Sequence, residues 1–197
     1  MTEISQEHAG VAIPVPRRRV GQGAERCYVR FAAIGDGGIR HVLASGLRSW
    51  PALLAAQVAS THDMSWCDAS TKKATAYDVR RVQLRIAVAH RPHLVALDVG
   101  AAGGRWSGAD LAEIAGHLEH CCRVLSARAA VVVTTHSGTG SRRRSGLAEL
   151  DGVYEDLARQ FGHIHLDRSA GMAPFVEQFA AAAALRGVPV RRDWRRR

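Results

Sequence analysis

The feature that most constrains the fold is an alternation, along the chain, of short apolar segments with longer segments of helical periodicity. Several of the apolar segments run into glycine or aspartate, as buried parallel strands do where they meet a loop. Strands that alternate with helices predict a parallel sheet covered by helices on both faces. We therefore expect a three-layer, doubly wound α/β sandwich of flavodoxin-like type, with about five parallel strands. The expected strands lie within residues 27–38, 62–70, 92–100, 129–137 and 163–167, and the expected helices within 50–60, 74–90, 111–125, 147–162 and 173–187.

The length and composition fit one globular domain preceded by an arm. The chain has 197 residues, of which 47% are hydrophobic and 23% charged, a ratio typical of globular proteins. Residues 1–25 lack periodicity and mix proline, glycine and arginine, which predicts a flexible N-terminal arm. We expect residues 26–197 to form a single domain that ends in a basic tail.

The positive charge is concentrated in arginine clusters. The formal net charge is +9, and removing the eleven arginines within 17–19, 142–144 and 191–197 would take it to −2. Because nucleic-acid binding usually needs a basic face on an ordered element, two basic tails and one loop disfavour a nucleic-acid ligand. An acidic partner for the arginine-rich tails stays open.

The cysteines and the N-terminal residues indicate the cellular compartment in which the protein is expected. Cys27, Cys67, Cys121 and Cys122 form neither a Cys-x-x-Cys pair nor a dense disulfide pattern, which indicates reduced, structural thiols. The mildly apolar AGVAIPVP precedes three arginines, the reverse of the order in a signal peptide, and no apolar run reaches the length of a membrane span. We expect a cytoplasmic protein.

The expected strand ends carry a recognisable series of motifs. In chain order they read AIGDGG, WCDAST, LDVGAAGG, VTTHSG and HIHLDRSAG. This series resembles the SGNH hydrolases, also called the GDSL esterase and lipase family, whose first strand ends in Gly-Asp-Ser, whose third ends in Gly-x-Asn-Asp and whose last motif is Asp-x-x-His. SWPALLAAQVA and GVYEDLARQFG are similar to the family's first and fourth helices, RPHLVALDVG is similar to one of its strands, and GVPVRRDW resembles the ending of actinobacterial members. The resemblance covers residues 26–197 and implies the SGNH hydrolase fold.

The chain departs from the family at the nucleophile. Gly35 and Asp36 match the first motif, but Gly37 stands where the family has its serine. A nucleophile needs a hydroxyl to form an acyl-enzyme, so covalent catalysis by residue 37 is excluded.

The groups that the resemblance assigns to the oxyanion hole are also changed. Lys73 falls on the position of the family's glycine, with a shift of two residues as the alternative, and Ala102 falls on the asparagine. Two of the three donors of that hole are therefore altered, and the Gly37 backbone N–H remains. The substrate-binding positions that the resemblance implies are Gly37, Gly38, Lys73, Gly100 and Ala102.

The last motif can be aligned in two registers. In one, His165 falls on the family's histidine and Gly162 on its aspartate; in the other, Leu166 falls on the histidine. The aspartate is missing in both registers, so the chain lacks a complete Ser-His-Asp set.

Three ionisable residues at the strand ends are the candidates for catalysis: Asp36, His136 and His165. The carboxyl ends of parallel strands meet along one edge, where a carboxylate and two imidazoles could transfer protons. Each has a plainer interpretation, with Asp36 capping a turn, His136 in a solvated loop and His165 packed within a strand. The resemblance implies neither a metal nor another cofactor.

These observations lead to one functional hypothesis and two alternatives. We expect a degenerate SGNH hydrolase that acts by non-covalent acid/base chemistry on a small acyl or biosynthetic substrate, or binds one. The first alternative is a catalytically inert interaction protein. The second is an esterase with a relocated nucleophile, such as Ser70 or Ser137.

Overall fold

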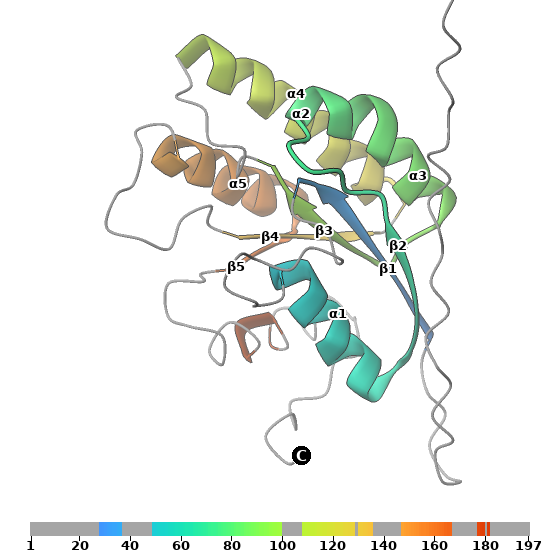
Figure 1. Cartoon of the computed structure of the whole chain (residues 1–197). Helices are drawn as coiled ribbons and strands as arrows, with labels where there is room; N and C mark the ends of the chain where they lie inside the picture. The colour runs from blue at the N-terminus through green and yellow to red at the C-terminus, as the bar shows by residue number, and fades with distance from the viewer. Residues whose placement is uncertain are drawn as a thin grey trace, which may run out of the picture.

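Five parallel strands form one sheet in the order β2-β1-β3-β4-β5 (Figure 1). They are β1 (Tyr28–Gly35), β2 (Asp63–Asp68), β3 (Leu94–Asp98), β4 (Val131–Thr135) and β5 (Ile164–Leu166). The structure is a computed structural model that describes residues 28–36, 49–99, 108–128, 130–135, 147–166, 177–179 and 181. The doubly wound parallel sheet predicted from the sequence is confirmed. The expected N-terminal arm and arginine-rich tail lie outside the described residues.

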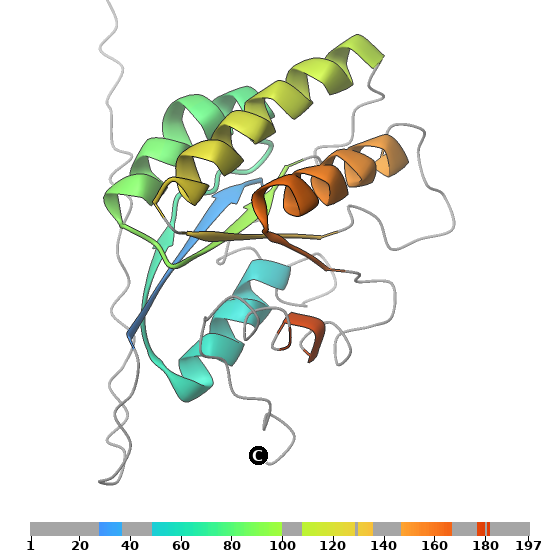
Figure 2. The ribbon, with the colours of Figure 1, turned by 180° about the vertical axis from the view of Figure 1, so that it is seen from behind.

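Helices cover both faces of the sheet (Figures 1 and 2). On one face lies α1 (Trp50–Thr61), near the short helical stretch at residues 177–179. The other face carries α2 (Ala76–Asp78), a π-helix η1 (Val79–Gln83), α3 (Leu84–Ala89), α4 (Gly108–Ser126) and α5 (Leu147–Phe161). Among the helices that the structure describes, none combines the length and the apolar character needed to cross a bilayer.

Local sequence signals explain where these helices begin and end. Pro51 occupies the first turn of α1, where its missing N–H would have had no partner. Thr75 and Asp78 form a reciprocal capping box before α2. Gly162 ends α5 with φ +66°, a left-handed conformation that glycine adopts without steric cost.

The sheet separates two apolar cores because successive side chains of a strand point to opposite faces. In β1, Phe31 and Ala33 pack with α1, whereas Ala32 and Ile34 pack with the α3–α4–α5 layer. All four are buried. Burial on both faces explains why the central strands read as continuous apolar runs rather than as alternating ones.

A helical segment lies within residues 74–90 as predicted, but not all of the residues that face the core are those predicted. The sequence predicts an apolar face that includes Val79 and Val82, but Val82 is 52% exposed and Gln83 is 2% exposed. That prediction was wrong for Val82 because η1 is a π-turn, which has more residues per turn than an α-helix and shifts the inward-facing position by one.

The described cysteines are free and buried, as expected of structural thiols. Cys121 and Cys122 lie on the inner side of α4, and Cys67 lies near the end of β2. Burial raises the pKa of both Cys121 and Cys122 to about 12. These two thiols are therefore protonated at neutral pH and poor nucleophiles.

Gly35→Ala tests the closest backbone approach in the sheet. Gly35 has φ +121°, and a Cβ built there would lie 1.8 Å from the carbonyl oxygen of Asp98. We expect the variant to lose about 2–4 kcal/mol of unfolding free energy in urea denaturation, because both the strained φ and the backbone clash must be relieved.

Gly152→Ala is the matched control, since a Cβ at Gly152 would meet nothing within 4 Å. Helix propensity predicts a gain of up to about 1 kcal/mol for that variant. Equal stabilities of the two variants would contradict the close approach between β1 and β3.

Candidate active site at the carboxyl edge of the sheet

The Gly35–Asp36 step lies at the centre of the carboxyl edge. Gly35 pairs in register with Asp98 of β3, and the Asp36 backbone N–H donates to the Asp98 carbonyl oxygen at 2.7 Å. The absence of a side chain at residue 35 permits this contact. The sequence-predicted carboxylate of Asp36 is thus attached to the two central strands, at the edge where ligands bind in doubly wound sheets.

The side chain of Gln83 holds the end of β1 from the π-helix. Its Oε1 accepts from the Gly35 N–H at 2.5 Å, and its Nε2 donates to the Gly35 carbonyl at 3.2 Å and to the Thr71 Oγ1 at 3.0 Å. The Thr71 N–H also donates to the Gly35 carbonyl at 3.0 Å. Gln83 therefore connects the first motif to the loop that follows β2.

Sequence reasoning missed Gln83. Residue 83 lies four residues after Val79 and three before Ile86, so it shares the expected apolar face of the helix. The available signal was a single uncharged polar residue between Arg81 and Arg85. In the structure Val79 and Gln83 are the two buried residues of η1.

A second carboxylate, Asp98, lies beside the Gly35–Asp36 step. Its Oδ2 accepts a hydrogen bond from the indole Nε1 of Trp50 at 2.7 Å. Trp50 is the first residue of α1 and is buried. The bond fastens α1 to the end of β3. In the sequence, the signal for Asp98 was an aspartate closing an otherwise apolar strand, to which we assigned no role.

Tyr154 of α5 reaches the same edge from the helical layer on the other face of the sheet from α1. Its hydroxyl accepts from the Val99 N–H at 2.8 Å and donates to the Val99 carbonyl at 2.9 Å. Burial raises the pKa of Tyr154 well above its ordinary value, and the carboxylates of Asp98 and Asp36 raise it further. The phenol therefore stays protonated and acts as a positioning group for the end of β3, not as a base.

His165 lies within β5, opposite Thr134 of β4. Its Nδ1 is 2.8 Å from the Thr134 Oγ1, and its ring stacks on that of Tyr154 with 6.5 Å between centroids. The imidazole is half-buried on the face covered by α5. Tyr154 thus contacts one of the candidates, His165, through its ring, while its hydroxyl binds the end of β3.

Lys73 and Ser70 lie in the loop after β2. Lys73 is exposed and has φ +65°, an uncommon value for a residue other than glycine. The Ser70 hydroxyl donates to the Asp68 Oδ1 at 2.5 Å, and the same oxygen accepts from the Ser70 N–H. Within the described part of the chain, no imidazole is hydrogen-bonded to Ser70.

The other predicted positions are not part of the described structure. They are Gly37, Gly38, Gly100, Ala102, His136 and Ser137. In the described ranges, no cluster of three or more His, Cys, Asp or Glu residues could hold a metal ion.

Solved structures share this arrangement of strands and helices. Axe2, an acetylxylan esterase from Geobacillus stearothermophilus, superposes with a TM-score of 0.55 at 13% identity, over 79% of this chain and 83% of Axe2. A putative lipolytic protein of the G-D-S-L family from Desulfitobacterium hafniense gives 0.56 at 18% identity, over 71% and 77% of the two chains. TesA gives 0.53 at 22% identity, over 74% and 78%.

The chain has the SGNH hydrolase fold. No protein-family model matches the sequence, and no curated protein matches it. At these identities the comparison supports the architecture of an SGNH hydrolase and leaves the activity to be argued from the residues themselves.

Gln83→Ala tests the hydrogen bonds by which Gln83 holds the end of β1. The variant leaves the buried Gly35 N–H and carbonyl with fewer partners and creates a cavity, so we expect a loss of about 2–4 kcal/mol of unfolding free energy. Gln160→Ala, at an exposed position of α5, should change stability by less than about 0.5 kcal/mol. If urea denaturation showed the two variants to be equally stable, these hydrogen bonds would be dispensable.

Proposed function

We propose that this chain is a member of the SGNH hydrolase superfamily that has lost serine hydrolysis and that acts on, or binds, a small acyl or biosynthetic substrate without a covalent intermediate. The observation that carries the proposal is Gly37, which follows the Gly35–Asp36 step where the family has its serine. The hydrolase-like fold and the attachment of that step to the centre of the carboxyl edge support it.

The remaining chemistry would be proton transfer. Asp36 supplies a carboxylate, and His136 and His165 supply imidazoles, the side chain that most often serves as a general acid or base. Removing a triad serine or histidine lowers turnover about a millionfold in a studied hydrolase, so ordinary ester hydrolysis is not expected. Asp98, held by Trp50, adds a second carboxylate near Asp36 that would favour cationic or proton-donating groups on a substrate.

A catalytically inert interaction protein is the second candidate, and one observation favours it. Three polar side chains at the strand ends hydrogen-bond within the protein, namely Gln83 to Gly35, Tyr154 to Val99 and Trp50 to Asp98. Groups used in this way maintain the scaffold and are not directed at a ligand. The relocated-nucleophile alternative is weakened at Ser70, whose hydroxyl bonds to Asp68 and not to an imidazole.

A fluorophosphonate probe tests the loss of the nucleophile. We expect no covalent adduct by intact-protein mass spectrometry, because residue 37 has no hydroxyl. Gly37→Ser should not restore esterase activity, since the new hydroxyl would lack an aspartate-oriented histidine. Labelling at Ser70 or Ser137, mapped by peptide analysis and lost in the corresponding alanine variant, would instead establish a relocated nucleophile.

Substitutions at the candidate residues test the acid/base proposal. Once a panel of small acyl compounds yields a turned-over substrate, Asp36→Asn and at least one of His136→Gln and His165→Gln should reduce kcat about 100- to 10,000-fold. Asp156→Asn, at an exposed residue of α5 paired with Arg159, should leave kcat unchanged. Thermal melting confirms folding. If all three folded variants kept wild-type turnover, the edge would not be the site of chemistry and the interaction protein would be favoured.

A further inference from the structure

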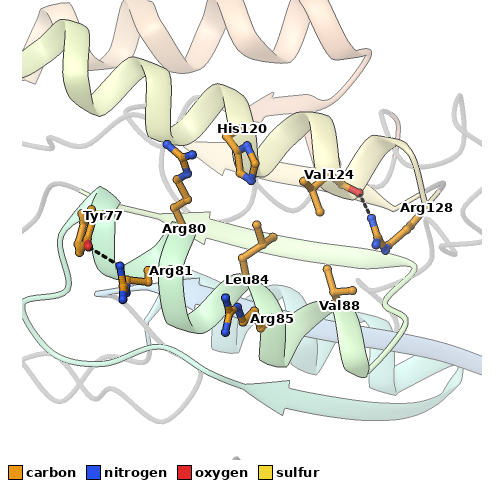
Figure 3. A pocket seen from close by; sticks show the side chains of 9 residues that line it. All are labelled: Tyr77, Arg80, Arg81, Leu84, Arg85, Val88, His120, Val124 and Arg128. Atoms are coloured by element: carbon orange, nitrogen blue, oxygen red, sulfur yellow. Dashed lines mark hydrogen bonds between the residues drawn. The ribbon is translucent and has the colours of Figure 1, made fainter.

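A basic groove lies between α4 and the η1–α3 segment, away from the strand ends (Figure 3). Its volume is about 500 Å³, and its lining includes four arginines: Arg80, Arg81, Arg85 and Arg128. All four side chains belong to exposed residues. We call this feature the basic groove. It differs from the arginine clusters seen in the sequence, because three of its arginines lie on the η1–α3 segment and the fourth, Arg128, comes from just after the end of α4, far along the chain.

Within the described residues, the arginines of the basic groove have no carboxylate partner. Arg81 donates to the Tyr77 hydroxyl at 2.9 Å, Arg80 lies 3.2 Å from the His117 Nδ1, and Arg128 donates to the Val124 carbonyl at 3.0 Å. None of the four arginines forms an ion pair with a carboxylate of the described residues. All these partners are uncharged or weakly basic, so the groove retains a net positive field.

Other arginines on the same side of the molecule are paired, which sets the groove apart. Arg123 of α4 forms an ion pair with Glu119, and Arg159 of α5 forms ion pairs with Glu155 and Asp156. These are ordinary i, i+3 or i, i+4 pairs on helix surfaces. The lack of such pairs in the groove is thus a local property and not a general feature of this helical layer.

Repulsion between the arginines destabilises the η1–α3 segment that bears them. Arg81 and Arg85 are four residues apart, a spacing at which like charges destabilise a helix by about 0.2–0.5 kcal/mol. The only acidic residue from Ala76 to Ala89 is Asp78. Its carboxylate caps the helix by accepting from the Thr75 N–H and hydroxyl, bonds that lower its pKa. An anionic ligand would relieve the repulsion that the chain leaves in place.

The π-turn supports a binding role independently of charge. A π-turn is rare and often found at functional sites, because it is less stable than the α-helix it interrupts. Here it directs Gln83 inward to Gly35, while Arg80 on the same turn points toward α4 and lies beside His120 (Figure 3). One irregular turn therefore serves both the sheet edge and the basic groove.

The floor of the basic groove is apolar. Leu84, Val88 and Val124 line it between the arginines, and Tyr77, which is 48% exposed, stands at one end (Figure 3). An inorganic ion would leave this surface in contact with water. An occupant with an aromatic or apolar part would cover it and gain the corresponding hydrophobic free energy.

We propose that the basic groove binds a small molecule that carries two or more phosphates on an aromatic or apolar body, with a nucleoside diphosphate as the simplest soluble form. Guanidinium groups bind phosphate oxygens through paired hydrogen bonds, and several can share one diphosphate. The volume falls within the range of small-molecule sites, about 300–1,000 Å³. This site goes beyond the function proposed for the carboxyl edge and does not depend on it.

Isothermal titration calorimetry with ADP tests the proposal on the full chain. We expect wild type to bind ADP, Arg80→Gln/Arg85→Gln to bind at least tenfold more weakly, and Arg123→Gln, which removes an already paired charge from α4, to bind as wild type does. Affinity should fall as salt is raised. Tyr77→Ala should weaken ADP binding but leave pyrophosphate binding unchanged, and Asp36→Asn should bind ADP normally.

Several results would overturn the proposal. Absence of heat with both ADP and pyrophosphate at millimolar concentrations would exclude a phosphate site. If Arg123→Gln and the double variant lost ADP affinity equally, the weaker binding would reflect the change in net charge and not the basic groove. Binding of a poly-glutamate peptide that the double variant abolishes, without binding of ADP, would assign the groove to an acidic protein partner. Thermal melting of each variant separates these results from loss of folding.

Discussion

The described structure depends on the close approach of Gly35 and Asp98, where the two central strands end side by side. The Asp36 N–H closes this contact by donating to the Asp98 carbonyl. Helices of both layers each contribute a polar side chain that hydrogen-bonds to these strand ends. Trp50 of α1 binds the Asp98 carboxylate, Gln83 of η1 binds the Gly35 backbone, and Tyr154 of α5 binds the backbone of Val99. The strand ends therefore position the two helical layers as well as the candidate site.

The hydrogen bonds of this network do not depend on the side chain at residue 37. Gln83 and Tyr154 bond to backbone groups and Trp50 bonds to the Asp98 carboxylate, and none of these bonds requires a hydroxyl at residue 37. Because buried polar groups are costly when unpaired, such a network is retained for stability whether or not the edge is catalytic.

The π-turn links the edge to the outer surface of the same layer. The extra residue in that turn exposes Val82, buries Gln83 and leaves Arg80 and Arg81 on the groove. Gln83 binds the end of β1 from this turn, and Arg80 of the same turn faces α4, so one turn contributes to both the sheet edge and the groove. Gln83 makes two hydrogen bonds from this turn to the Gly35 backbone.

The sequence alone determined the alternation of strands and helices and the doubly wound class, since both follow from hydrophobic periodicity and from helix-ending glycines such as Gly162. It also determined that residue 37 has no nucleophile. Only the tertiary structure decided that Gln83 bonds to Gly35, that His165 packs against Tyr154, and that Arg128 shares one groove with the arginines of the η1–α3 segment. These three features depend on contacts between segments that are distant in the chain. The hydrophobic periodicity of one segment does not encode such contacts.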